Sequence, residues 1–253
     1  MMHRNVKGEL VGSRTPDQLE NDRRFKEVAL KQIANSGENW AIHSLAIMKR
    51  NALARVLYLN DLYQEIVTVP GVICEFGVQW GASLSVLLNL RNIYEPYNVE
   101  RYIYGFDTFA GFASVHEKDG AEAKVGDYAS TDNYDTTLAE ILAYHESISA
   151  FQQQRKFELI KGDATQTIET WLDQNPGATI ALAIFDMDVY APTKAVLEKI
   201  KPRLTSRSIL VFDEFTHQKF PGEVQAVREA FDMQTVEFTR SIHQSHVAIM
   251  KFR

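Results

Sequence analysis

Residues 71–83, with the sequence GVICEFGVQWGAS, constrain the fold of this chain more than any other stretch. The first half is a short apolar, β-branched run that comes directly after Val69-Pro70. This pattern predicts a buried strand that follows a turn. In the second half, Gly77 and Gly81 allow sharp turns and the close approach of a ligand, and an apolar helical run begins at Ser83. A strand, a glycine loop and a helix in this order form the first unit of a nucleotide-binding type of α/β sheet.

The charge of this loop indicates which ligand it prefers. A dinucleotide loop has the form GxGxxG and leaves room for a pyrophosphate, and this loop lacks that form. Glu75, at the predicted strand end, would repel a phosphate and attract a cationic α-ammonium or sulfonium group. The loop therefore favours S-adenosylmethionine over NAD. An ordinary strand-to-helix turn, an NAD-type Rossmann oxidoreductase and a non-catalytic ligand-binding protein are the alternatives.

Composition is that of a soluble globular protein. The 253 residues are 45% hydrophobic and 24% charged, and they suffice for one large domain with an added helical segment. No run approaches the roughly 18 apolar residues of a membrane span, and the start lacks the apolar core of a signal peptide. We therefore expect a cytoplasmic protein without membrane contact. The net charge of -6 argues against a nucleic-acid partner, and Cys74 in the first strand predicts a buried, inert thiol.

Residues 1–67 are expected to form an arm and helices that cap the site or mediate oligomerisation, and residues 68–253 the domain that binds S-adenosylmethionine. Residues 1–16 are polar and unpatterned, which predicts a flexible arm or lid. Helices are predicted over residues 17–35 and 43–67, the first capped by Asp17 and the second with apolar residues at steps of three or four. This second helix packs against the sheet, or forms a subunit contact or a substrate cover. The two N-terminal helices together add apolar surface beyond what one sheet face needs, which predicts a homo-oligomer.

Acidic residues follow the predicted strands of the second half. Strands are predicted over residues 101–106, 156–160, 179–185 and 208–212, with helices over 136–151, 164–173, 192–203 and 223–233. An antiparallel pair over 236–238 and 247–250 closes the sheet, and the irregular stretch 108–135 predicts a lid over the site. The carboxyl edge of an open α/β sheet is the ligand crevice. The acids at that edge are Glu75, Asp107, Asp163, Asp186 and Asp213.

These acids suit different roles. Asp107 is placed to hold a ribose, and Asp163 either accepts a hydrogen bond from an adenine amino group or caps the helix that starts at Ala164. Asp186, Asp213 and Glu214 would repel one another unless a proton or a cation lay between them. Magnesium is the natural candidate, with manganese or calcium as alternatives. His217 lies in the aromatic loop that follows Glu214. Its role is that of a base, a substrate contact or a surface residue.

Together these stretches resemble the macrocin O-methyltransferase (TylF) family of class I methyltransferases. The matching segments are VPGVICEFGVQWGAS at 69–83, GFDTF at 105–109, FDMDVYAPT at 185–193 and VFDEF at 211–215. The resemblance implies a Rossmann-like, mostly parallel seven-stranded sheet with helices on both faces, a last strand that is antiparallel, and N-terminal helices that build oligomers. It also implies Mg²⁺-assisted transfer of a methyl group from S-adenosylmethionine to a hydroxyl of a sugar or another natural-product intermediate.

Carried onto this sequence, the resemblance assigns Asp186, Asp213 and Glu214 as metal ligands, with Asp186 also close to the acceptor hydroxyl. The family commonly has Asp-Asp where this chain has Asp213-Glu214, and this departure bears on the metal. An alcohol with a pKa near that of water, about 16, must lose its proton, which Asp186 or His217 would accept. The residues expected to bind the donor are Glu75, Gly77, Gly81, Ser83, Asp107, Thr108, Phe109, Asp163 and Ala164.

Overall fold

The computed structural model describes residues 3–4, 10–11, 15–217 and 219–252. The chain divides into two compact units, Met1–Ala54 and Arg55–Arg253. The predicted arm over residues 1–16 lies largely outside the described residues, apart from a short antiparallel pair between β1 (His3–Arg4) and β2 (Leu10–Val11). Each unit is described here by itself.

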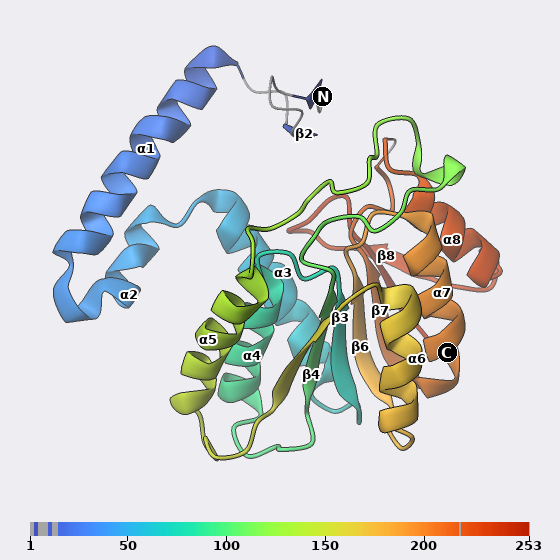
Figure 1. Cartoon of the computed structure of the whole chain (residues 1–253). Helices are drawn as coiled ribbons and strands as arrows, with labels where there is room; N and C mark the ends of the chain where they lie inside the picture. The colour runs from blue at the N-terminus through green and yellow to red at the C-terminus, as the bar shows by residue number, and fades with distance from the viewer. Residues whose placement is uncertain (1–2, 5–9, 12–14, 218, 253) are drawn as a thin grey trace. The chain divides into compact units, whose positions relative to one another are not determined.

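The Arg55–Arg253 unit is built on a seven-stranded sheet with the strand order β5-β4-β3-β6-β7-β9-β8 (Figure 1). Its first five strands are parallel, whereas β9 runs antiparallel to both β7 and β8. This confirms the predicted α/β class, the mostly parallel sheet and the antiparallel closing pair. The strands are β3 (Val72–Phe76), β4 (Ile103–Asp107), β5 (Phe157–Lys161), β6 (Ile180–Phe185), β7 (Leu204–Phe212), β8 (Phe238–Arg240) and β9 (Ala248–Lys251).

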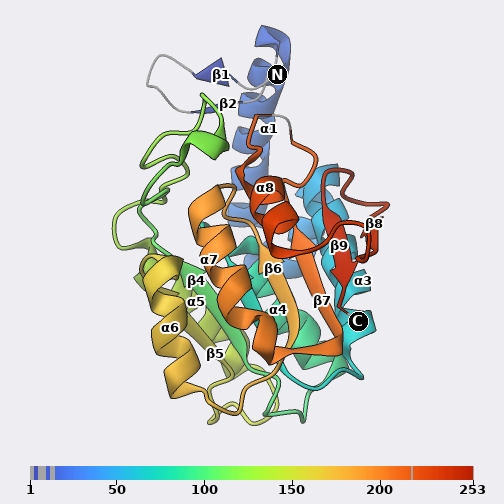
Figure 2. The same ribbon diagram turned by 90° about the vertical axis from the view of Figure 1, so that its right-hand side faces the viewer.

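Helices cover both faces of the sheet (Figure 2). One core forms between the sheet and α3 (Arg50–Ile66), α4 (Ala82–Tyr94) and α5 (Tyr134–Ser147). The other forms against α6 (Ala164–Gln174), α7 (Tyr190–Ile200) and α8 (Gly222–Ala230). Because both faces are covered, the central strands β3 and β6 are buried along their whole length, as their continuous apolar runs predict. Cys74 is likewise fully buried.

In the Met1–Ala54 unit, α1 (Pro16–Asn35) begins one residue before the predicted helix. Thr15, rather than Asp17, is the N-cap, and its side chain forms a capping box with Gln18. A 3₁₀ turn, η1 (Gly37–Asn39), follows.

The single helix predicted over residues 43–67 is wrong. The chain instead forms α2 (Trp40–His43), the 3₁₀ turn η2 (Ser44–Ile47) and α3, which begins at Arg50. The Ser44 hydroxyl donates to the carbonyl of Ala41 (2.6 Å), and Met48 adopts an extended backbone with ψ of 118°. A local side-chain hydrogen bond thus competes with the helical pattern, and an extended residue ends it.

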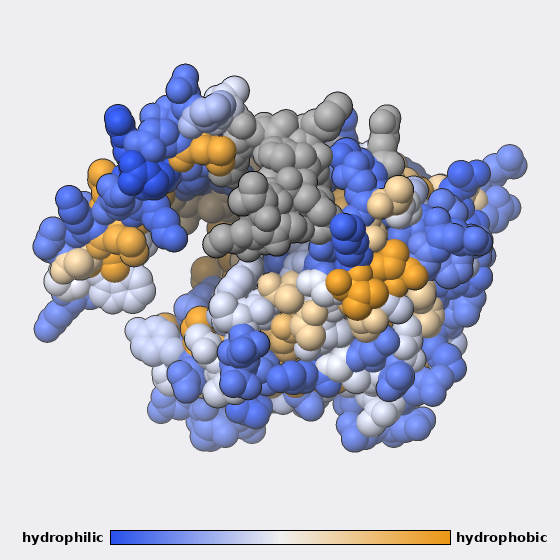
Figure 3. All heavy atoms as spheres, turned by 45° about the horizontal axis from the view of Figure 1, so that its top comes forward, coloured by the Kyte–Doolittle hydropathy of each residue, from blue (hydrophilic) through white to orange (hydrophobic). Residues whose placement is uncertain are grey.

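Large apolar side chains remain exposed on the helical unit. None of the described residues of α1 is buried. Apolar side chains interrupt its hydrophilic surface (orange in Figure 3). Within the described ranges, every helix is too short or too polar to span a membrane. The exposed apolar residues of this unit are Leu19, Phe25, Val28, Leu30, Ile33, Trp40, Ile42, Leu45, Met48 and Leu53.

Candidate active site

The predicted acids gather at the carboxyl edge of the sheet. Glu75 is the penultimate residue of β3, Asp107 is the last residue of the parallel strand β4, and Asp186 and Asp213 directly follow β6 and β7. Register pairs join Phe76 to Phe185 and Phe185 to Phe212, so the exits of these strands are adjacent. Asp163 follows β5 at the same edge.

The glycine loop packs closely against the backbone that follows the carboxyl end of β6. Gly77 has φ of 94°, and a Cβ atom there would lie 1.9 Å from the backbone oxygen of Asp186. Gly81 has φ of 72° at the N-cap of α4, where a Cβ would meet Leu138 at 2.3 Å. Gly77 therefore requires glycine for conformation and for space, and Gly81 is favoured as glycine by its left-handed conformation.

Asp107 shapes this loop. Its Oδ2 accepts hydrogen bonds from the backbone N–H groups of Val78 and Gln79, both at 2.7 Å. Its Oδ1 accepts from the N–H of Phe109 at 2.5 Å, where Phe109 has φ of 56°. The carboxylate thus holds the turns on either side of it. A contact to a ribose would be an additional role, beside these three hydrogen bonds to the backbone.

Other residues expected at the donor site have local partners. The Asp163 carboxylate caps α6, which starts at Ala164, by accepting from the N–H of Thr165 (2.9 Å). This is the structural alternative considered for Asp163, and adenine binding stays a prediction. Thr108 Oγ1 donates to the carbonyl of Gly111 at 2.6 Å.

Arg55 is a site residue that sequence reasoning missed. From α3 its Nη2 reaches Asp186 Oδ2 at 3.5 Å and Asp213 Oδ1 at 3.6 Å. Its Nη1 donates to Ser83 Oγ at 2.7 Å, so a residue expected at the donor site helps to hold the guanidinium. The amphipathic pattern of the helix gave no signal for this role, because only the fold brings α3 to the strand ends.

Two buried groups near Arg55 have an oxygen without a hydrogen-bond partner among the described residues. Glu75 is 1% exposed with Oε2 unpartnered, and Tyr58, one turn after Arg55 on α3, is 3% exposed with an unpartnered hydroxyl. Burial and the nearby Asp186 carboxylate raise the pKa of Glu75, while Arg55 lowers it. Unpaired buried polar atoms are costly, so these two are candidates to bind a ligand.

The surroundings of Asp186 and Glu214 raise the pKa of both carboxyl groups. Burial, and next the Asp213 carboxylate, raise the pKa of Asp186 to about 7, and the Arg55 guanidinium opposes this shift. Burial and Asp213 also raise the pKa of Glu214 to about 7. The Asp186 side chain is 27% exposed, so an acceptor can reach it.

These side chains do not fit the predicted magnesium ion. Within the described parts of the chain, no group of three or more His, Cys, Asp or Glu residues could hold a metal ion. Asp186 and Asp213 instead share the Arg55 guanidinium, and Glu214 Oε2 lies 3.5 Å from His217 Nδ1 without forming a hydrogen bond to it. A side-chain cation from α3 occupies the position that the sequence pattern assigns to a metal.

His217, the predicted histidine base, lies beside Glu214 and stacks on Phe220. Burial lowers its pKa. A second histidine, His246, comes closer to the acidic pair, with Nε2 3.7 Å from Asp213 Oδ2, and its pKa is raised by that contact. His246 precedes β9, and sequence spacing gave no reason to place it at this edge.

Two further buried acids surround the pair. Asp188 is 7% exposed and has φ of 61°. Glu223 is fully buried, and its Oε1 accepts from the backbone N–H of Glu214 at 3.0 Å. Burial, followed by the neighbouring carboxylates, raises the pKa of both groups.

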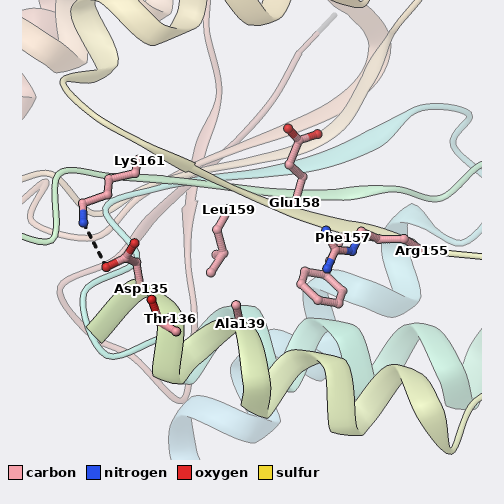
Figure 4. A pocket seen from close by; sticks show the side chains of 8 residues that line it. All are labelled: Asp135, Thr136, Ala139, Arg155, Phe157, Glu158, Leu159 and Lys161. Atoms are coloured by element: carbon pink, nitrogen blue, oxygen red, sulfur yellow. Dashed lines mark hydrogen bonds and ion pairs between the residues drawn. The ribbon is translucent and has the colours of Figure 1, made fainter. Parts of the chain in front are cut away.

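A separate cavity of about 380 Å³ opens between α5 and β5 (Figure 4). Lys161 and Asp135 form an ion pair on its wall at 2.9 Å, and Arg155 stacks on Phe157. Since none of the predicted site residues lines it, the acidic edge remains the candidate site. Its lining residues are Asp135, Thr136, Ala139, Arg155, Phe157, Glu158, Leu159 and Lys161.

Comparison with known proteins places this geometry in context. Residues 74–215 match the family described as "Methyltransferase domain". The structure is similar to that of CalS11, a calicheamicin methyltransferase, with a TM-score of 0.87 and 34% identity over 98% of this chain and 97% of CalS11. An apo structure of CalS11, described as a TDP-rhamnose 3'-O-methyltransferase of calicheamicin biosynthesis, matches with a TM-score of 0.81 and 32% identity over 98% and 99% of the two chains.

A more distant likeness concerns the fold alone. The O-methyltransferase NovP has a TM-score of 0.56 and 17% identity over 79% of each chain. No curated protein matches the sequence.

Proposed function

Because the chain belongs to the methyltransferase domain family, we propose that it transfers the methyl group of S-adenosylmethionine to a hydroxyl of a sugar. The observation that carries this proposal is the likeness to CalS11 over nearly the whole of both chains. The glycine loop and the acidic strand ends support it, because they lie at the edge where open α/β sheets bind ligands. An NAD-type oxidoreductase has no comparable support.

The chemistry requires alignment and removal of one proton. The acceptor oxygen attacks the methyl carbon, the C–S bond breaks, and the neutral thioether leaves, so the protein must hold the partners in line. We assign proton removal to Asp186, which is partly exposed and faces Arg55, a cation that favours its ionised form. We assign His217, which lies beside Glu214, as a contact to the acceptor.

The donor is proposed to lie along the glycine loop. Its cationic amino-acid end would meet the unpartnered carboxylate oxygen of Glu75, and its ribose would meet Asp107. A buried oxygen without a partner favours a cationic ligand group there. No step is assigned to magnesium, because Arg55 occupies the position between Asp186 and Asp213.

The test uses S-adenosylmethionine with TDP-rhamnose as acceptor and mass spectrometry to detect one added methyl group. The wild type should methylate the sugar, and Asp186→Asn should bind S-adenosylhomocysteine normally in calorimetry while losing turnover. Absence of donor binding would contradict the whole proposal. Donor binding without transfer would contradict the acceptor class and favour a non-catalytic binding protein.

We also propose that the chain is a homo-oligomer that buries the apolar side chains of its helical unit. Val28 and Ile42 are large apolar side chains that are 59% and 62% exposed. Light scattering should give a multiple of 28.8 kDa for the wild type and a lower multiple for Val28→Glu with Ile42→Glu. Ile148→Glu, which changes a side chain that is 66% exposed outside this unit, is the control and should keep the wild-type mass.

A further inference from the structure

The irregular loop over residues 108–133 is fastened to α7 by one buried carboxylate. Asp119, in the 3₁₀ turn η3 (Glu117–Asp119), is fully buried. Its Oδ1 accepts from the backbone N–H of Tyr190, and its Oδ2 accepts from the N–H of His116, both at 2.6 Å. One oxygen therefore binds the loop itself, and the other binds the first residue of α7.

Asp119 supplies a cap that α7 lacks. The N-cap residue of α7 is Val189, which has no side chain able to accept a hydrogen bond. A carboxylate from the loop satisfies one of the free N–H groups of the first turn and complements the helix dipole. The turn before Tyr190 contains Asp188 in a left-handed backbone conformation and starts at Asp186. The cap thus stabilises the segment that carries the proposed base.

Gly222 leaves room for this carboxylate. A Cβ atom at Gly222 would lie 2.0 Å from Asp119 Oδ1 and 2.7 Å from the Tyr190 nitrogen. The first residue of α8 must therefore be small for the contact between Asp119 and Tyr190 to form. Three segments distant in sequence meet at this point.

Charged side chains reinforce the same junction. Glu229 of α8 forms ion pairs with Lys118 of the loop and Lys194 of α7, and it accepts from the Tyr190 hydroxyl at 2.7 Å. The Lys118 ammonium also lies 4.1 Å from the centre of the Tyr190 ring. The loop is thus held by one buried and several exposed contacts.

The other part of the loop reaches the glycine loop. Gln79 Nε2 donates to the backbone carbonyl of Tyr128 at 3.2 Å, and Tyr134 donates its hydroxyl hydrogen to the carbonyl of Trp80 at 3.0 Å. The loop and the first turn of α5 therefore connect the proposed donor side of the edge with the exit of β6.

We propose that Asp119 is a positioning residue: it fixes the loop across the carboxyl edge and, through Tyr190, fixes the turn that carries Asp186. This rests on the proposed function only where turnover is concerned. The geometry predicts that closure of the loop and alignment of the base depend on one fully buried carboxylate whose two oxygens accept from backbone N–H groups.

The test compares Asp119→Asn with Glu146→Gln. The amide of Asn directs an N–H toward one of the two backbone donors, so one hydrogen bond is lost while size is kept. Glu146 is the control for loss of a buried carboxylate far from the site: it is 5% exposed, accepts from the backbone N–H of Lys156 at 2.8 Å and also pairs with the buried Lys156 ammonium at 2.6 Å, before the start of β5 at the opposite edge. Gly222→Ala is a second variant that crowds Asp119 and leaves the carboxylate in place.

Hydrogen exchange over residues 186–190 and tryptic cleavage after Lys124 are measured first, since neither depends on the acceptor. Asp119→Asn and Gly222→Ala should each raise both rates about tenfold, with S-adenosylhomocysteine affinity within about threefold of the wild type. Their kcat with TDP-rhamnose should fall about 10- to 100-fold, the cost of a small misalignment. Glu146→Gln should leave exchange at 186–190, cleavage and kcat near the wild-type values.

The proposal would be overturned if hydrogen exchange and tryptic cleavage in Asp119→Asn had the same rates as in the wild type. It would also be overturned if the loss of kcat in Asp119→Asn were no larger than the loss in Glu146→Gln. A wild type without turnover would contradict the proposed function instead, and the exchange and cleavage results would still decide whether Asp119 holds the loop and the turn.

Discussion

Arg55 Nη2 lies 3.5 Å from Asp186 Oδ2, so a cation from α3 faces the carboxylate that follows β6. The same nitrogen is 3.6 Å from Asp213 Oδ1. Two carboxylates at adjacent strand ends repel each other, and one guanidinium between them offsets much of that repulsion. The crevice therefore contains a built-in positive charge.

Replacing Arg55 by Met should leave this acidic pair uncompensated. Turnover should fall, and the affinity for Mn²⁺ alone, measured by calorimetry, should rise about tenfold because the two carboxylates no longer bind a guanidinium. Arg55→Lys keeps the charge and is the matched variant, with Mn²⁺ affinity near that of the wild type. Equal Mn²⁺ affinity in wild type and Arg55→Met would show that Arg55 does not compensate the pair.

The rate of methyl transfer should depend on pH through Asp186. Its pKa is raised to about 7, chiefly by burial, and a base acts only when it is deprotonated. The value of kcat/KM should therefore rise as pH increases through about 7. Because the guanidinium lowers this pKa, Arg55→Met should move the rising limb to higher pH. A limb at the same pH in both proteins would contradict Asp186 as the titrating base.

Asp107→Ala should destabilise the glycine loop as well as weaken donor binding. Three backbone N–H groups, those of Val78, Gln79 and Phe109, would lose their acceptor. We expect the free energy of unfolding to fall by about 1 to 3 kcal/mol, together with weaker binding of S-adenosylhomocysteine. Denaturant titration and calorimetry measure the two effects. Normal stability with weakened binding would instead indicate a contact to the ligand alone.

Gly77→Ala should destabilise the protein more than the addition of one methyl group would suggest. The φ of 94° is strained for alanine, which costs about 1 to 3 kcal/mol, and the added Cβ overlaps the Asp186 carbonyl. Thermal unfolding should show a clear loss of stability. The control is Gly177→Ala, where a Cβ would have no neighbour within 4 Å and which should be neutral. Similar melting temperatures for the two variants would contradict the close approach.

Much of this edge could be predicted from sequence. Each buried parallel strand appears as a continuous apolar run, and the residue that follows it must lie at the common carboxyl edge, which placed Asp186 and Asp213 there, while Glu75 lies one residue before the end of β3. Arg55 and His246 could not be placed, because α3 and the segment before β9 reach the edge only through tertiary packing. The acidic pattern alone fits a metal ion and a guanidinium equally well.

The break between α2 and α3 illustrates a second limit. Apolar spacing continues through residues 43–50, and periodicity therefore predicted one helix. A hydroxyl-to-carbonyl hydrogen bond at Ser44 and the extended Met48 are local choices that hydropathy does not register.

The order of the last two strands affects how the chain completes its fold during synthesis. Among the strands of the described residues, β8 pairs only with β9, and β9 in turn pairs with β7. β8 emerges from the ribosome before β9, so it has no partner strand until β9 follows and inserts beside β7. His246 lies just before β9, and its contact with Asp213 therefore forms in this late step. The acidic crevice acquires its last side chain only after every parallel strand has been made.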